Sequence, residues 1–195
     1  MPEISKKTDV NEMQRPKVEN FREIKPMGDM KPDDAKKYWN KKFEETRESD
    51  NSEKKIEKTL GEYFKDLKSK SDCPDTIPKK PFEASDLKKR TPEENAKMRE
   101  EFMDVKSQIK KEWEEQYGRP WPKYQQDVYS ASGKLIRKAG SDYDAHHIQP
   151  LGMGGKNEAR NITPLHAEVH YDKQGVHAPD SPYSKLDQML GGMEK

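Results

Sequence analysis

The chain has little apolar material and only one cysteine. Of its 195 residues, 29% are hydrophobic and 38% are charged, and the mean hydropathy is −1.35. So little apolar surface predicts one modest core joined to solvated or helical extensions, and it argues against a single compact domain. The lone Cys73 excludes an internal disulfide and is typical of a chain that matures in a reducing compartment.

The sequence also lacks long hydrophobic runs and an excess of charge of one sign. No stretch approaches the ~18 to 20 apolar residues of a membrane span, and the first residues, MPEISKKTDVNEMQRPK, contain no apolar run typical of a secretory signal peptide. We therefore expect no membrane partner. The formal net charge is +1, from 38 basic and 37 acidic residues, so any attraction for phosphate must be local.

Composition and periodicity divide the chain into four regions, of which the first two reach residue 90. Residues 1–30 are polar, contain three prolines and predict an extended or disordered leader. Residues 31–90 predict a helical segment followed by an irregular, proline-rich connection. One helix is expected to begin at Pro32, and a second is expected to carry an apolar stripe at helical spacing. That stripe comprises Ile56, Leu60, Tyr63 and Leu67.

Residues 91–120 predict a capped amphipathic helix. Thr91 is the expected N-cap, Pro92 the first helical residue, and Glu94 the partner that completes a capping box. The helix is expected to end near Gly118. Its apolar stripe, typical of a face packed against a core, comprises Met98, Phe102, Val105, Ile109 and Trp113.

Residues 121–195 predict a small module of strands and helix. DVYSASGKLI predicts a hairpin that turns at Ser132 and Gly133, and DYDAHHIQPL predicts a strand. GMGGKNEARN predicts a glycine-bearing loop, ITPL a short strand, and PLHAEVHYDK a helix of roughly two or three turns. The expected fold class is therefore α+β, with this module at the C-terminal end of a helical, partly extended region.

Four of the five histidines lie in residues 144–170, DAHHIQPLGMGGKNEARNITPLHAEVH. His166 and His170 are four residues apart on the predicted helix, so both imidazoles are expected on one face, where they suit one tetrahedral metal ion. His146, on the predicted strand, can supply a third ligand. Three neutral imidazoles leave one position open for water or a phosphate oxygen, as hydrolytic metal sites require.

The neighbouring His147 is expected to have a different role. Consecutive residues of a strand face opposite sides, so His147 is not expected to share a metal ion with His146. An unperturbed histidine titrates near pH ~6.5, which suits His147 to accept a proton from water beside a metal-bound phosphate. Asn161 is expected to brace the loop by side-chain hydrogen bonds and so orient this base. His177 lies outside the pattern and is expected to be a loop residue and not a ligand.

The order of these features resembles that of the HNH, or ββα-metal, endonucleases. The features are a His-His pair, a loop with adjacent glycines, an Asn and an HxxxH pair. The resemblance is closest to the DNase domains of colicins and the HNH nuclease domains of bacterial polymorphic toxins. It covers residues 144–170 well and residues 120–190 more loosely. It implies a C-terminal ββα-metal module that binds one divalent ion, Mg²⁺ or Zn²⁺, with Ni²⁺ or Mn²⁺ as alternatives.

The resemblance also implies a role for individual residues. It makes His147 the general base, Asn161 the loop brace, and Asp144 an acid that orients a neighbouring group. The metal ligands that it implies are His146, His166 and His170.

The sequence departs from the family in its cationic residues. The colicin DNases carry arginines shortly before the His-His pair that contact the scissile phosphate, but here that stretch is KAGSDYD. Arg137 and Lys138 are the nearest substitutes and the expected substrate contacts. Residues 121–195 contain nine Lys/Arg and nine Asp/Glu, so the module lacks the basic excess expected of a DNA binder.

Together these features predict a metal-dependent endonuclease that acts on DNA. The resemblance further implies an antibacterial toxin made in a bacterial cytoplasm, exported by a specialised secretion system, active in the target-cell cytoplasm, and neutralised by a cognate immunity protein. Two alternatives stay open: a non-catalytic binding module that is stapled by its metal, and a nuclease that prefers RNA, since nothing in these residues reads or excludes a 2′-hydroxyl.

Overall fold

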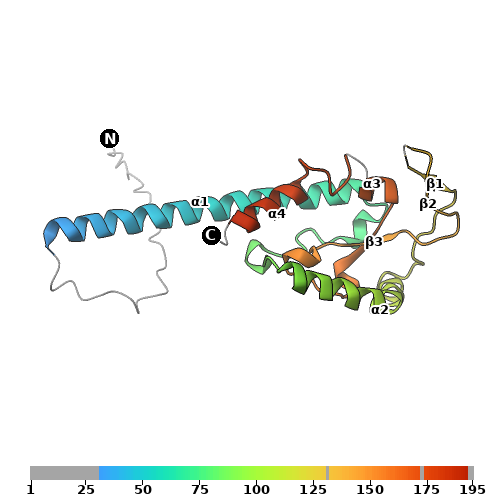
Figure 1. Ribbon diagram of the computed structural model, residues 1–195. Helices are drawn as coiled ribbons and strands as arrows, with labels where there is room; N and C mark the ends of the chain where they lie inside the picture. Colours follow the sequence, from blue (N-terminus) through green and yellow to red (C-terminus); the bar gives the residue numbers. More distant parts are fainter. Residues whose placement is uncertain (1–30, 131, 172–173, 193–195) are drawn as a thin grey trace, which may run out of the picture. The chain divides into compact units, whose positions relative to one another are not determined.

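The computed structural model describes residues 31–130, 132–171 and 174–192 (Figure 1). The expected leader, residues 1–30, lies outside the described residues. The chain forms two compact units, Met1–Thr46 and Arg47–Lys195. Within the described ranges, no helix is both long and apolar enough to cross a membrane.

Helix α1 spans Pro32–Lys70 as one element, where the sequence predicted two helices. Residues 46–52, TRESDNS, contain neither glycine nor proline, so nothing there interrupts the helical hydrogen bonds. In the first unit, Trp39 and Phe43 are exposed. In the second unit the predicted stripe of α1 is buried, and it consists of Ile56, Leu60, Tyr63 and Leu67.

Helix α2 spans Pro92–Tyr117, and both of its ends were predicted. Thr91 Oγ1 accepts a hydrogen bond from the Glu94 amide, and Glu94 Oε2 accepts one from the Thr91 amide, which together form the capping box. Gly118 ends the helix with φ of 64°, a left-handed conformation that glycine adopts without a steric penalty.

Two antiparallel hairpins follow. Strands β1 (Val128–Tyr129) and β2 (Leu135–Arg137) form the first hairpin, and strands β3 (Asp144–His147) and β4 (Ile162–Leu165) form the second. The register of the second hairpin places His146 opposite Thr163. Helix α3 (Ala167–Tyr171) comes directly after β4, and helix α4 (Pro182–Gly192), which was not predicted, follows. Short 3₁₀ helices lie at Pro74–Thr76, Ala84–Asp86, Leu151–Met153 and Ala159–Asn161.

The helices α1 and α2 pack against the β3–β4 hairpin through separate apolar clusters, and Figure 1 shows the hairpin between them. The first cluster joins Leu60 and Leu67 of α1 to Leu165 of β4. The second joins Trp113 of α2 to Ile162 of β4. The strands are therefore held from both sides by helices that come earlier in the chain, and the fold class is α+β, as predicted.

Candidate metal centre

Three histidines from three different segments lie together. They are His146 of β3, His170 of α3, and His177 in the segment between α3 and α4. One ring nitrogen of each lies within 4.8 Å of the other two, and the ring centroids are 5.1 to 5.3 Å apart. His146 is buried, His170 half-buried and His177 exposed. The group therefore reaches from the interior to the surface, as a site that admits a substrate must.

The spacing of two of these nitrogens fits a shared metal ion. His146 Nδ1 lies 3.4 Å from His170 Nε2. Two nitrogens bound at about 2.0 to 2.1 Å to one tetrahedral ion are separated by about 3.3 to 3.4 Å. Burial, followed by the charges of His170 and His177, lowers the pKa of His146 well below its usual value, so the ring is neutral, as a metal ligand must be. The donor set fits a divalent ion.

His170 is oriented by a carboxylate. Asp144 Oδ2 lies 3.4 Å from His170 Nδ1, while Asp144 Oδ1 accepts hydrogen bonds from Arg137 Nε at 2.9 Å and Nη2 at 2.7 Å. Burial alone would raise the pKa of Asp144, but the hydrogen bonds from His170 and Arg137 outweigh it and lower that pKa. The contact resembles the carboxylate–histidine pairs that fix the rings of metal-bound histidines in other proteins.

His166 is not in this group of nitrogens. Its ring packs edge-on against Tyr124 and Tyr143, at centroid distances of 4.9 and 5.2 Å. The predicted helix placed His166 and His170 on one face, but α3 begins only at Ala167, one residue after His166. The His166 carbonyl accepts the first helical hydrogen bond, from the His170 amide, and its ring Nδ1 accepts from the Glu168 amide at 3.4 Å. Since a residue that flanks a helix in this way need not have helical angles, its side chain does not follow the helical face.

His177 lies in a loop, as expected, but its ring contacts the two other histidines. The loop turns back onto α3 because Val176 is fully buried and its amide donates to the Val169 carbonyl. The His177 ring also packs edge-on against Tyr183 of α4, with centroids 4.3 Å apart. The signal in the sequence was the apolar Val176 directly before the histidine, which predicts an anchored loop more than a solvated one.

His147 points to the α2 side of the hairpin. Its Nε2 lies 3.0 Å from Asn157 Oδ1, its ring packs edge-on against Phe102, and Asn157 Nδ2 donates to the Met98 carbonyl. A carbonyl only accepts, so the Asn157 amide must present its oxygen to His147 and accept from Nε2–H. The unprotonated nitrogen of His147 is therefore Nδ1. Burial lowers the pKa of His147 to about 4, which keeps the ring neutral near pH 7.

Asn161 holds the loop that connects the two strands. Its Oδ1 accepts from the Gln149 amide at 2.8 Å, and its Nδ2 donates to the carbonyls of Gln149 and Lys156. These are the contacts expected of a loop brace. The side chain that bonds to His147 is Asn157, which the sequence reasoning missed, because its distance of ten positions from His147 spans an irregular loop.

The adjacent glycines of this loop are required by its tight path. Gly154 has φ of 96°, and a Cβ at Gly155 would lie 1.9 Å from the Gln149 carbonyl oxygen. Arg90, which precedes α2, donates to the carbonyls of Leu151, Gly154 and Gly155. The loop is thus fixed to the residues that precede α2.

The two residues predicted to contact the substrate, Arg137 and Lys138, have different surroundings. Arg137 is engaged by Asp144, whereas Lys138 is exposed and its carbonyl accepts from Ser141. A third cation, Arg99, is exposed on α2, three residues before Phe102 and so on a neighbouring position of the helix surface. The pKa of His147 depends first on burial and second on the hydrogen bond to Asn157. The charge of Arg99 is a third influence, and it lowers this pKa.

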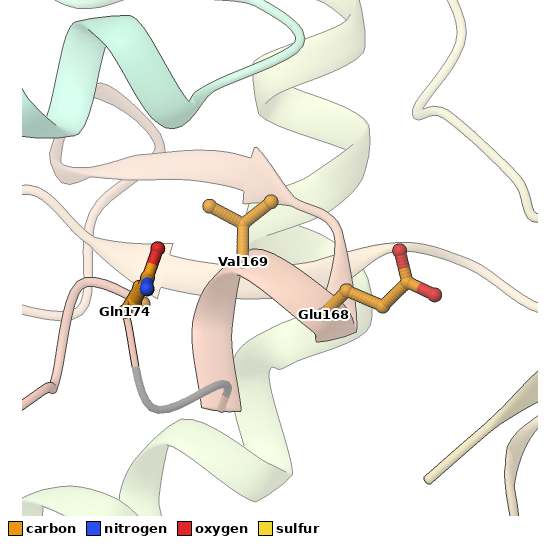
Figure 2. Close-up of a pocket in the computed structure, with 4 residues that line it drawn as sticks. Glu168, Val169 and Gln174 are labelled. Atoms are coloured by element: carbon orange, nitrogen blue, oxygen red, sulfur yellow. The ribbon is translucent and has the colours of Figure 1, made fainter. Parts of the chain in front are cut away.

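A small pocket of about 190 Å³ lies beside α3 and does not coincide with the histidine group (Figure 2). Its lining residues are Glu168, Val169, Gln174 and Gly175. Pockets for small organic ligands are usually larger, roughly 300 to 1,000 Å³. The histidine group, whose rings converge from three segments, is therefore the better candidate for a reactive centre.

Two proteins of known description are similar to part of this chain. It is 41% identical over 111 residues to Toxin YxiD of Bacillus subtilis, a match that covers 56% of this chain and 19% of the toxin. It is 36% identical over 81 residues to the "Probable deoxyribonuclease RhsB" of Dickeya dadantii, covering 42% of this chain and 5% of that protein. The matches thus span a minor part of each relative. No family model matches the chain.

Proposed function

We propose that this chain is a metal-dependent endonuclease of the HNH type that hydrolyses phosphodiester bonds in DNA. The observation that carries the proposal is the 3.4 Å approach of His146 Nδ1 and His170 Nε2, two nitrogens spaced as ligands of one ion. The opposite nitrogens of these rings contact Tyr63 and Asp144. His177 is the third ligand in this proposal, in place of His166.

His147 is the general base of the proposed reaction. A bound divalent ion, Mg²⁺ or Zn²⁺, would stabilise the negative charge that grows on the phosphate and on the departing 3′ oxygen. His147 Nδ1 accepts a proton from the attacking water, and Asn157 holds the ring by accepting from Nε2–H. Asp144 orients His170, and Asn161 fixes the loop that follows the base.

Cationic side chains around the site would bind the DNA backbone. Lys138 is exposed and suited to a phosphate contact. Arg137 is the other proposed phosphate contact, and its guanidinium is bonded to Asp144 and to the Ile136 carbonyl. Arg99 adds a positive charge on the α2 side, near the proposed base. Local cations of this kind compensate for the absence of a net basic charge.

The names of the two relatives support a nuclease toxin. One relative is described as a toxin and the other as a probable deoxyribonuclease. We extend these descriptions to a role for this chain: an antibacterial toxin, exported by a specialised secretion system, that acts in the cytoplasm of the target cell. Its proposed partners are DNA and a cognate immunity protein that protects the producing cell.

Incubation with supercoiled plasmid and, in parallel, total RNA tests this proposal. The purified protein is assayed with Mg²⁺, Zn²⁺, Ni²⁺, Mn²⁺ or EDTA. We expect metal-dependent loss of DNA that EDTA abolishes. Degradation of RNA with intact DNA would instead identify an RNA-preferring nuclease. Intact DNA and RNA, from protein shown to be folded and metal-loaded, would identify the metal-stapled binding module.

Removal of the metal is expected to abolish cleavage but to preserve most of the helical circular dichroism. The reason is that α1 and α2 contact the hairpin through apolar clusters that include none of the three histidines. A metal that staples the core would behave differently, because its loss would unfold the module. Far-ultraviolet spectra before and after EDTA distinguish the two, and a collapse of the helical signal would contradict the catalytic assignment.

A further inference from the structure

Tyr63 lies at the histidine group although it is 83 positions from His146 in the sequence. It belongs to α1 and is fully buried. Its hydroxyl oxygen lies 3.3 Å from His146 Nε2 and 2.8 Å from the Ile148 carbonyl oxygen. The hydroxyl therefore bridges two residues of the segment that carries the metal ligand and the base.

The directions of these two hydrogen bonds are determined by their partners. The Ile148 carbonyl can only accept, so the single hydroxyl proton of Tyr63 is donated to it. The lone pairs that remain on the hydroxyl face His146, and Nε2 of His146 must carry a proton to donate to them. A neutral imidazole has one proton, so Nδ1 is then the nitrogen with a lone pair, and Nδ1 is the atom that lies 3.4 Å from His170 Nε2.

The same aromatic residue supports a second histidine of the group. The rings of Tyr63 and Tyr183 are 6.2 Å apart, and Tyr183 packs edge-on against His177 at 4.3 Å. Aromatic pairs at such distances contribute about 0.5 to 1.5 kcal/mol beyond the burial of their area. Tyr63 thus contacts His146 directly through its hydroxyl. Its link to His177 is indirect, because Tyr63 packs against Tyr183 and Tyr183 packs against His177.

We propose that Tyr63 is a positioning residue of the metal centre, and that its hydroxyl selects the His146 tautomer in which Nδ1 faces the ion. This inference rests on the proposed function only in that it takes His146 as a metal ligand. It makes the upstream helix α1 a part of the site and not merely a cover for its core. A module that starts after α1 would lack this hydrogen bond.

Tyr63→Phe tests the proposal, because it removes the hydroxyl and keeps the ring. Partners of this kind change metal affinity by about 10- to 100-fold, so we expect the dissociation constant for Zn²⁺ to rise by that factor in a chelator-competition titration. Tyr117→Phe is the matched control. The Tyr117 hydroxyl also donates to a backbone carbonyl, that of Thr76, but Tyr117 packs against the second apolar cluster, which contains Trp113 and Ile162. Wild-type affinity in Tyr63→Phe, or an equal loss in Tyr117→Phe, would overturn the proposal.

A second measurement needs no substitution. In a long-range ¹H–¹⁵N spectrum of the metal-free wild-type protein, His146 should appear as the tautomer protonated at Nε2. Protonation at Nδ1 would overturn the proposal even if Tyr63→Phe fails to fold. Both readouts are independent of cleavage, so a protein that binds Zn²⁺ but leaves DNA intact would refute the nuclease assignment and not the role of Tyr63.

Discussion

Replacing His177 by alanine is expected to lower the rate of plasmid cleavage at least ~100-fold, because a direct ligand matters more to metal binding than the outer partners that change affinity 10- to 100-fold. His177 is an exposed loop residue and belongs to none of the apolar core clusters, so its replacement should leave the fold intact. The apparent affinity for the metal should fall with the rate. Cleavage assays at several metal concentrations, with calorimetric titration of the same samples, measure both effects.

His166→Phe is the matched control for His177→Ala. It removes the imidazole nitrogens and keeps a ring between Tyr124 and Tyr143. Cleavage close to the wild-type rate is expected, since the His166 ring is engaged by these tyrosines. The reverse result, with His166→Phe inactive and His177→Ala active, would restore the ligand set His146, His166 and His170 that the HNH resemblance implies.

His147→Ala is expected to lower the cleavage rate ~10²- to 10⁴-fold, the usual contribution of a general base. Metal binding should be unchanged, because His147 bonds to Asn157 and packs against Phe102 and takes no part in the histidine group. The rate is measured on supercoiled plasmid at saturating metal, together with metal stoichiometry. A His147→Ala protein that cleaves as fast as the wild type would remove this residue from the mechanism.

Asn157→Leu separates the chemistry of His147 from its orientation. The substitution removes the acceptor for Nε2–H and the hydrogen bond to the Met98 carbonyl, but leaves His147 in place. One hydrogen bond contributes about 0.5 to 1.5 kcal/mol, so a loss of roughly tenfold or less is expected. An effect as large as that of His147→Ala would mean that Asn157 has more than an orienting role.

The sequence predicted best those features that depend on neighbours along the chain. Both ends of α2 were predicted because its capping box and its terminal glycine cap involve residues at most four positions apart. The opposite orientations of His146 and His147 follow from the alternation of a strand in the same way. The strands β3 and β4 were also predicted, each from a short local run of residues.

The geometry of the histidine group could not be predicted in full, because it depends on where elements begin and on distant contacts. The predicted helix began at Pro164, whereas α3 begins at Ala167, and this shift of three residues leaves His166 outside the helix. Tyr63 reaches the site from another helix, 83 positions away, and no local pattern marks it as more than a core residue. His177 is brought back by the buried Val176, a tertiary contact that spacing alone does not determine.

In the proposed reaction, one metal ion at these histidines is responsible for the cleavage of DNA. Its most direct test is a titration of Zn²⁺ or Mg²⁺ into metal-free protein, with bound metal and the initial rate of plasmid cleavage recorded in the same samples. The rate is expected to rise in proportion to bound metal and to saturate at about one ion per chain, as a site with three protein ligands and one open position requires. Full cleavage in the metal-free protein, or saturation by metal with no cleavage, would contradict it.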